Sequence, residues 1–151
     1  MQSDVPANTE LDREVVTTRG EKYAVREVRE RISLAEPRVV LLRELDGATI
    51  ETLSIMGEAV AELTQGLDAY AILVDLSEAT GMTTPDYRRF IPQFFTNLHQ
   101  KGALKHVAVA FYGNAAVRIA SKFLIARMMQ VPFSIHANRA SALQAARTAL
   151  R

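Results

Sequence analysis

Two adjacent threonines, Thr83 and Thr84, stand where this sequence predicts that a polar loop passes into a helix. A phosphoryl group on a hydroxyl at a helix N-terminus is stabilised by free backbone amides and by the positive end of the helix dipole. Thr84 is also a good N-cap residue, and Pro85 after it suits the first helical position. The pair therefore carries two interpretations, phosphorylation of Thr83 or Thr84 and simple capping of the helix.

The loop that carries these threonines begins at Asp75, after a run of apolar residues. An acid at the end of a strand can accept hydrogen bonds from loop amides, so we expect Asp75 to anchor the loop rather than to act in catalysis. The loop and the start of the helix form a candidate surface for a protein partner. Its residues are Ser77, Thr83, Thr84, Asp86, Arg88 and Arg89.

A second strand-to-helix turn offers a candidate anion site. Gly113 and Asn114 place free amides at the start of a predicted helix, and Arg118 follows on that helix. A turn of this kind also occurs as a plain connection, and Arg118 also suits a solvated helix face.

Residue patterns for catalysis, metals and cofactors are missing from the sequence. The three histidines, His99, His106 and His136, have no carboxylate at ligand spacing, and there is no cysteine. The sequence also lacks a Gly-rich phosphate loop, a nucleophile elbow, a dinucleotide fingerprint and an aromatic and basic nucleic-acid motif. We therefore expect no metal site, no cofactor, no nucleic acid and no enzyme.

Aromatic residues recur at helical spacing after the threonines. Phe90, Phe94 and Phe95 belong to one apolar face of the predicted helix. They fit the core of a small α/β domain, and the alternative is the wall of a lipid cavity.

Strands and helices alternate along most of the chain. We expect strands at residues 14–18, 22–28, 39–42, 69–76, 106–111 and 131–136, while 31–35 is ambiguous. Helices are predicted at residues 50–66, 85–101, 114–129 and 139–150, and the first and last of them have N-caps at Thr49 and Asn138. This order predicts an α/β fold with a mostly parallel sheet, early strands added at its edge on the amino-terminal side, and about four helices.

Length and composition predict one domain. The chain has 151 residues, of which 48% are hydrophobic. We expect a flexible tail over residues 1–12 and a domain over 13–151. No signal peptide or transmembrane segment is recognisable, which favours a soluble, cytoplasmic protein.

Charge divides unevenly along the chain. Residues 1–80 hold 8 Lys/Arg and 16 Asp/Glu, whereas residues 81–151 hold 10 Lys/Arg and one acid. Such asymmetry indicates either an acidic ligand, a nucleic acid or an anionic membrane on the basic side, or two halves that interleave in the fold.

The element order and several motifs resemble a STAS domain, the fold of bacterial anti-anti-sigma factors. Asp75-Leu76-Ser77, Met82 and the hydroxyl pair before a helix are similar to that family's strand, loop and helix. Thr83-Thr84-Pro85-Asp86 replaces the family's signature of acid, hydroxyls and glycine. The resemblance is closer to the divergent SpoIIAA-like branch, which shares its fold with lipid-exchange proteins of the CRAL-TRIO kind.

That closer resemblance covers about residues 20–151. Its motifs are residues 71–76, 84–89, 106–110, 133–136 and 142–143. It implies a non-enzymatic bacterial regulatory module that binds a protein partner, a regulator or kinase, and is switched by phosphate on Thr83 or Thr84. The alternative is a small carrier or sensor of a lipid or anionic metabolite.

Overall fold

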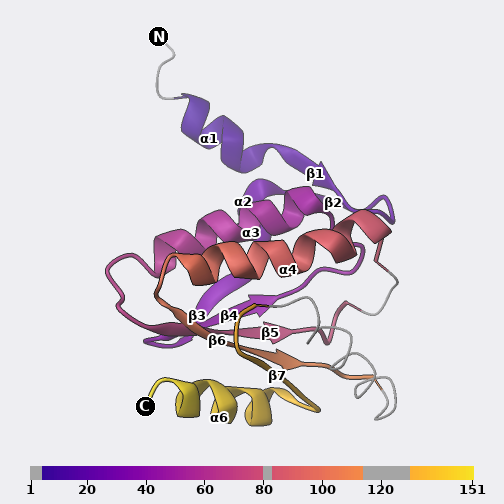
Figure 1. The fold of residues 1–151 in the computed structure, drawn as a ribbon. Coiled ribbons are helices and arrows are strands. Elements are labelled where there is room, and N and C mark those ends of the chain that lie inside the picture. Colours follow the sequence, from indigo (N-terminus) through magenta and orange to yellow (C-terminus); the bar gives the residue numbers. More distant parts are fainter. Residues whose placement is uncertain (1–4, 80–82, 114–129) are drawn as a thin grey trace.

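A five-stranded sheet forms the centre of the molecule, which the computed structural model describes over residues 5–79, 83–113 and 130–151 (Figure 1). The strands lie in sequence order: β3 (Ile32–Glu36), β4 (Val39–Arg43), β5 (Tyr70–Asp75), β6 (Leu104–Ala110) and β7 (Phe133–His136). The strands β4 to β7 are parallel, and β3 is antiparallel to β4 at one edge. The predicted α/β class and mostly parallel sheet are confirmed, and the ambiguous segment 31–35 becomes the edge strand.

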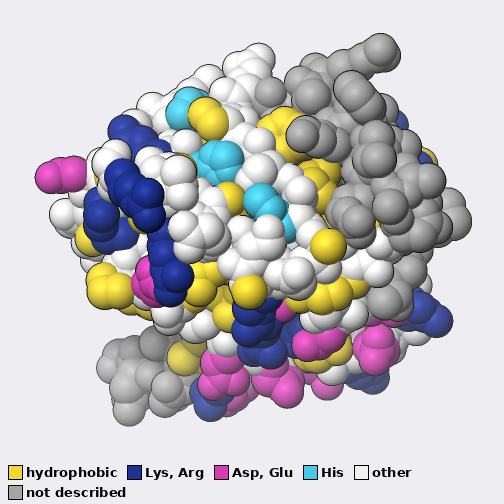
Figure 2. Space-filling view, turned by 90° about the horizontal axis from the view of Figure 1, so that it is seen from below, with side chains coloured by type: hydrophobic (Ala, Val, Ile, Leu, Met, Phe, Trp, Pro, Cys, Tyr) yellow, Lys and Arg dark blue, Asp and Glu magenta, His cyan; other side chains and the backbone are white. Residues whose placement is uncertain are grey.

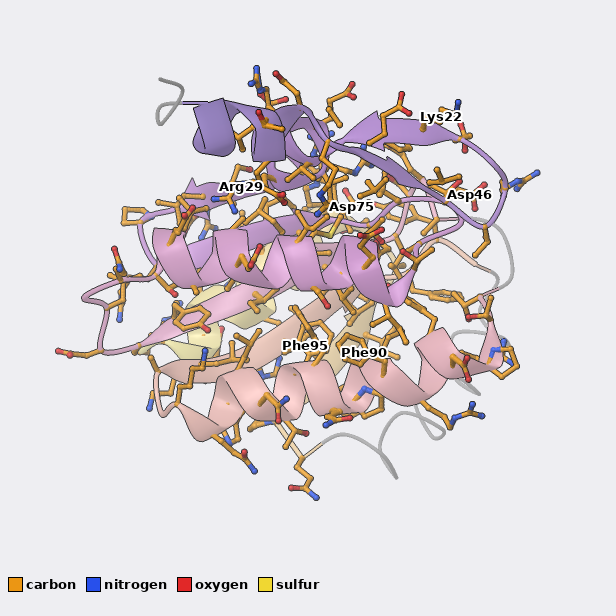
Figure 3. The ribbon with its side chains drawn as sticks, turned by 90° about the horizontal axis from the view of Figure 1, so that it is seen from above. Lys22, Arg29, Asp46, Asp75, Phe90 and Phe95 are labelled. Carbon is orange, nitrogen blue, oxygen red and sulfur yellow. The ribbon has the colours of Figure 1, made fainter. Side chains whose placement is uncertain are left out.

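Helices cover both faces of this sheet. The helices α3 (Ile50–Leu63) and α4 (Pro85–Gln100) lie side by side on one face, and α6 (Arg139–Ala149) lies on the other (Figures 1 and 3). All six residues of β5 are buried, as a central strand covered on both faces requires. Because side chains alternate along a strand, Ile72 packs in the α3/α4 core, whereas Leu73 packs with α6.

The amino-terminal segment forms a separate layer above α3 (Figure 1). It contains α1 (Val5–Asp12), β1 (Glu14–Val16), β2 (Lys22–Ala24) and α2 (Val25–Arg29). The strands β1 and β2 pair only with each other, so the expectation that all early strands extend the main sheet is wrong for these two. The helix α1 lies in the segment that the sequence predicted as a flexible tail, residues 1–12.

The predicted strand at residues 22–28 is also wrong in its second half. Val25 and Val28 are 3% and 0% exposed, and their spacing places both on one face of a short helix. The Glu27 side chain stabilises the start of α2, because its Oε1 accepts a hydrogen bond of 2.8 Å from the Ala24 amide. The imperfect alternation of apolar residues in this segment reflects the helical period.

The helix count differs from the prediction for two reasons. The described residues contain five helices, of which α1 and α2 were not expected. The predicted helices at 50–66, 85–101 and 139–150 are confirmed as α3, α4 and α6, and the predicted helix at 114–129 lies outside the described residues. The predicted N-caps Thr49, Thr84 and Asn138 each accept a hydrogen bond from a backbone amide of the first turn.

The acidic and basic halves of the chain interleave. The strand β5 of the first half pairs with β6 of the second, and ion pairs join Arg139 to Asp75 and Arg147 to Glu36.

Among the helices of the described ranges, none combines the length and the apolar character that crossing a bilayer requires.

Candidate functional site

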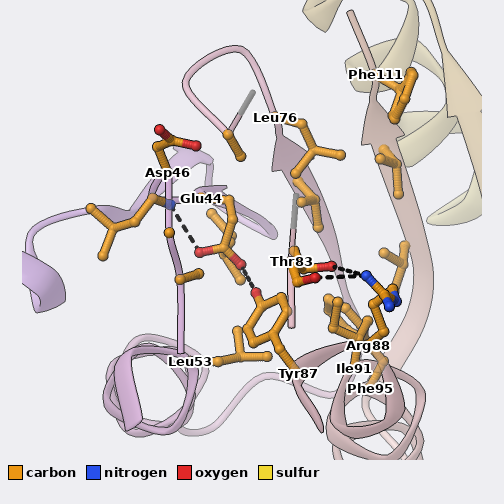
Figure 4. Close-up of a pocket in the computed structure, with 18 of the residues that line it drawn as sticks. Glu44, Asp46, Leu53, Leu76, Thr83, Tyr87, Arg88, Ile91, Phe95 and Phe111 are labelled. Carbon is orange, nitrogen blue, oxygen red and sulfur yellow. Dashed lines mark hydrogen bonds between the residues drawn. The ribbon is translucent and has the colours of Figure 1, made fainter. Parts of the chain in front are cut away.

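A cavity of about 360 Å³ opens at the carboxyl ends of β4, β5 and β6, beneath α3 and α4 (Figure 4). Open α/β sheets bind ligands at this end of their strands because the loops that follow them converge there. Most of the wall is apolar, and its main side chains are Leu42, Leu53, Val74, Ile91, Phe95 and Val109.

One polar pair is built into this wall. The Tyr87 hydroxyl donates a hydrogen bond to Glu44 Oε2, and the Leu45 amide donates one of 2.9 Å to Oε1 (Figure 4). The two side chains come from the end of β4 and the first turn of α4, and Glu44 and Tyr87 are only 7% and 2% exposed. Both carboxyl oxygens of Glu44 are thus hydrogen-bonded within the protein.

Burial changes the acidity of both members of the pair. It raises the pKa of Glu44, although the Tyr87 hydroxyl, the Leu45 amide and the Arg31 charge oppose the change. Burial also raises the pKa of Tyr87, and the neighbouring Glu44 carboxylate raises it further. Tyr87 therefore keeps its proton and remains a hydrogen-bond donor at neutral pH.

A cation and a hydroxyl line another part of the cavity. Arg88 Nη1 donates a hydrogen bond of 2.6 Å to the Thr83 carbonyl oxygen and lies 3.5 Å from Thr83 Oγ1 (Figure 4). Arg88 is exposed to solvent, so its guanidinium is a positive group at the border between the cavity and water.

The other residues of the predicted partner surface lie around the cavity rather than in its wall. Thr84 Oγ1 accepts a hydrogen bond of 3.2 Å from the Tyr87 amide, which confirms its capping role. Asp86 and Arg89 form an exposed ion pair one turn apart. Their binding to a partner, like that of Ser77, stays a prediction, as does phosphorylation of Thr83 or Thr84.

The expected role of Asp75 is confirmed. Its Oδ1 accepts a hydrogen bond of 2.8 Å from the Ser77 amide, and its Oδ2 accepts one of 2.9 Å from Arg139 Nε. Burial by itself raises the pKa of Asp75, but the Ser77 amide and the Arg139 guanidinium outweigh it and lower the pKa below its ordinary value. No local sequence pattern indicates the Arg139 contact, because the contact depends on where α6 packs.

Phe94 and Phe95 of α4 both belong to the buried core, as predicted, and a lipid at the cavity stays a prediction. Phe95 also lines the cavity, whereas Phe94 packs against Gly57 of α3. The Phe94 and Phe95 rings meet edge to face with centroids 5.0 Å apart, so core and cavity wall are continuous.

Only part of the predicted anion site lies within the described residues. Gly113 lies at the end of a described range, while Asn114 and Arg118 lie outside it, so that site stays a prediction. No group of three or more His, Cys, Asp or Glu side chains in the described part of the chain is arranged to hold a metal ion.

Sequence reasoning did not identify Glu44 or Tyr87 as site residues. A signal for Glu44 existed, because an acid directly after a buried strand lies at the ligand-binding edge of the sheet.

Comparisons with family models, curated proteins and solved structures find no significant match to this chain.

Proposed function

We propose that this protein is a small carrier or sensor that binds an amphipathic ligand with an apolar body and one anionic group. The observation that carries the proposal is the cavity of about 360 Å³, whose wall is mainly apolar and includes the guanidinium of Arg88. Ligand sites of proteins have this character, with volumes of about 300 to 1,000 Å³ and a few polar groups that orient the ligand.

Arg88 is the group best placed to bind the anion. Both of its contacts with Thr83 involve Nη1, and a guanidinium carries five N–H donors. Nη2 and Nε can therefore bind a carboxylate or phosphate while the Thr83 contact is kept. Burial raises the pKa of Glu44, which favours its neutral form and so lessens its repulsion of an anion.

The test compares laurate with dodecanol, which has the same chain and no charge. Isothermal titration calorimetry should detect laurate binding, and Arg88→Ala should weaken it about tenfold because a charge-assisted hydrogen bond is lost. Dodecanol binding should be unchanged by Arg88→Ala. The control is Arg89→Ala, which removes the adjacent guanidinium that pairs with Asp86 outside the cavity wall.

A second variant tests the cavity itself. Ile91→Trp adds volume from α4 into the cavity and should abolish binding of both laurate and dodecanol, with folding checked by circular dichroism. Absence of binding by the wild-type protein, or equal loss of laurate and dodecanol in Arg88→Ala, would contradict the proposal.

A second candidate function is the regulatory protein-interaction module, and one observation favours it. Arg88 Nη1 lies 3.5 Å from Thr83 Oγ1, so a phosphate on Thr83 would lie close enough to the Arg88 guanidinium to form an ion pair. Capture of the tagged protein from its native cytosol, with mass spectrometry of the Thr83/Thr84 peptide, tests this function. A stoichiometric regulator or kinase that binds wild type and Thr83→Glu differently is expected, and equal binding would overturn the switch.

Either function is compatible with the proposed family, a STAS-like domain of the SpoIIAA-like branch in the bacterial cytoplasm. The parallel sheet with an antiparallel edge strand, and α3 and α4 together on one face, support this proposal.

A further inference from the structure

A second cluster of reactive side chains lies on the other face of the sheet, beside α6. His106 of β6, Ser134 and His136 of β7, and Ser141 of α6 line a groove of about 550 Å³. Figure 2 shows this face of the molecule, with histidine side chains among polar groups near its centre. The cavity described above borders Val107 and Val109, whose side chains point to the opposite face.

Strand register brings these residues together. Ala108 pairs with Ser134 and Ala110 with His136, so the alternation of side chains places His106, Ser134 and His136 on one face. The Asn138 side chain accepts a hydrogen bond of 2.8 Å from the Ser141 amide and fixes the first turn of α6 next to His136.

The hydroxyl of Ser134 lies between two imidazoles. Its Oγ is 2.8 Å from His106 Nε2 and 2.6 Å from His136 Nε2. A hydroxyl has one proton, so Ser134 donates to one ring, and the other ring donates its own N–H to Oγ. His136 Nδ1 in turn lies 3.0 Å from Ser141 Oγ, which orients that ring.

We propose that Ser134 is a nucleophile for acyl transfer from small esters to water, with His136 as its general base and His106 as an N–H donor to the reacting oxygen atoms. A nucleophile within hydrogen-bond reach of a base that a third group orients is the arrangement such chemistry requires. Ser141 is a positioning residue. This activity is distinct from ligand binding in the cavity and goes against the expectation from sequence that the protein is not an enzyme.

Both steps of the proposed reaction require only these residues, the ester and water. Ser134 Oγ attacks the ester carbonyl carbon, and its proton passes to His136 Nε2. The carbon–oxygen bond to the alcohol breaks, and the alcohol leaves with that proton. Water then attacks the acyl group on Ser134, gives one proton to His136 and releases the carboxylic acid, and the proton returns to Oγ.

The protonation states suit these roles. Burial lowers the pKa of His106, and the neighbouring His136 lowers it further, so His106 is neutral at pH 7 and can present an N–H at Nε2. Among the described residues that line the groove, the two imidazoles are the titratable groups, since the others are serine, glutamine, threonine and alanine.

The test is labelling of the full chain with an alkyl fluorophosphonate. Ser134 Oγ bonds to phosphorus, the P–F bond breaks, and the proton and fluoride are released. Intact mass should show one adduct, and peptide mapping should place it on Ser134. Ser134→Ala should lose the adduct, and His136→Ala should slow labelling about 100-fold, the scale of general-base assistance.

Controls separate the groove from the rest of the chain. Ser54→Ala changes an exposed serine of α3, and His99→Ala changes a histidine that contacts the Leu104 carbonyl oxygen, so both should label at the wild-type rate. In Ser141→Ala labelling should slow, because His136 loses the contact that orients its ring, and Ser141→Thr should restore the rate.

Two outcomes would overturn the proposal. One is the absence of an adduct on Ser134 at every pH from 6 to 9, and the other is labelling that is as fast in His136→Ala as in wild type.

Discussion

Asp75 and Arg139 join the carboxyl end of β5 to the first turn of α6, although 64 positions separate them in the sequence. Arg139 Nε donates to Asp75 Oδ2 at 2.9 Å, and the Asp75 side chain is only 3% exposed. The pair ties α6 to the central strand on the face opposite the cavity, while the other oxygen of Asp75 holds the loop through the Ser77 amide.

Removal of Arg139 should destabilise the fold. Arg139→Ala leaves the buried Asp75 carboxylate without its cation, and we expect a loss of about 2 kcal/mol in the free energy of unfolding, measured in urea. The matched control is Arg147→Ala, which breaks the exposed pair of α6 with Glu36 and should change stability little. Equal effects of the two substitutions would contradict the structural role of the Asp75 pair.

The Asp75 pair also predicts a pH dependence. The folded pKa of Asp75 is lowered from 3.8, so its contribution is complete above that value and is lost as the pH falls through the folded pKa. The stability difference between wild type and Arg139→Ala should therefore be full at pH 6 and shrink below pH 3.8. Urea unfolding at a series of pH values measures this, and a constant difference would show that Arg139 acts through packing alone.

Tyr87→Phe should destabilise the protein more at high pH than at low pH. The hydroxyl stabilises the charged form of Glu44, whose folded pKa is raised above 4.5, so the ionised carboxylate of the variant keeps the Leu45 amide but loses its other donor. We expect a loss of about 2 kcal/mol at pH 8 and a smaller loss at pH 4.5. Glu44→Gln should remove this difference between the two pH values in thermal or urea unfolding.

Gly57→Ala should weaken the contact between α3 and α4. A Cβ at Gly57 would lie 2.8 Å from Phe94 Cε1, which is closer than atoms pack without movement. We expect this overpacking to destabilise the protein by about 1 to 3 kcal/mol, which exceeds the stabilisation of about 1 kcal/mol from the higher helix propensity of alanine. A Gly57→Ala/Phe94→Leu double-mutant cycle should show coupling between the sites, and additive effects would rule out the clash.

Thr84→Ala should lower stability by about 1 kcal/mol, because the Tyr87 amide loses its acceptor at the start of α4. Thr84→Ser keeps the hydroxyl and should remain close to wild type in chemical unfolding. If both variants are as stable as wild type, capping is not the role of Thr84, and phosphorylation becomes the favoured interpretation.

The sequence by itself determined the α/β class, the parallel strands β4 to β7, the helices α3, α4 and α6, and their caps. These features depend on local periodicity and on hydrogen bonds between near neighbours such as Thr84 and Tyr87. The short helix α2 was not predicted, because five residues are too few to display a clear helical period.

Only the tertiary structure decided the rest. The separate hairpin of β1 and β2, the Glu44–Tyr87 pair and the Asp75–Arg139 pair all join segments whose distance in space no local pattern contains. Ser134 and the two imidazoles around it depend on the register of β6 against β7 and on the position of α6. Such juxtapositions arise from packing two faces of a sheet against helices, which is a property of the whole chain and not of any window of it.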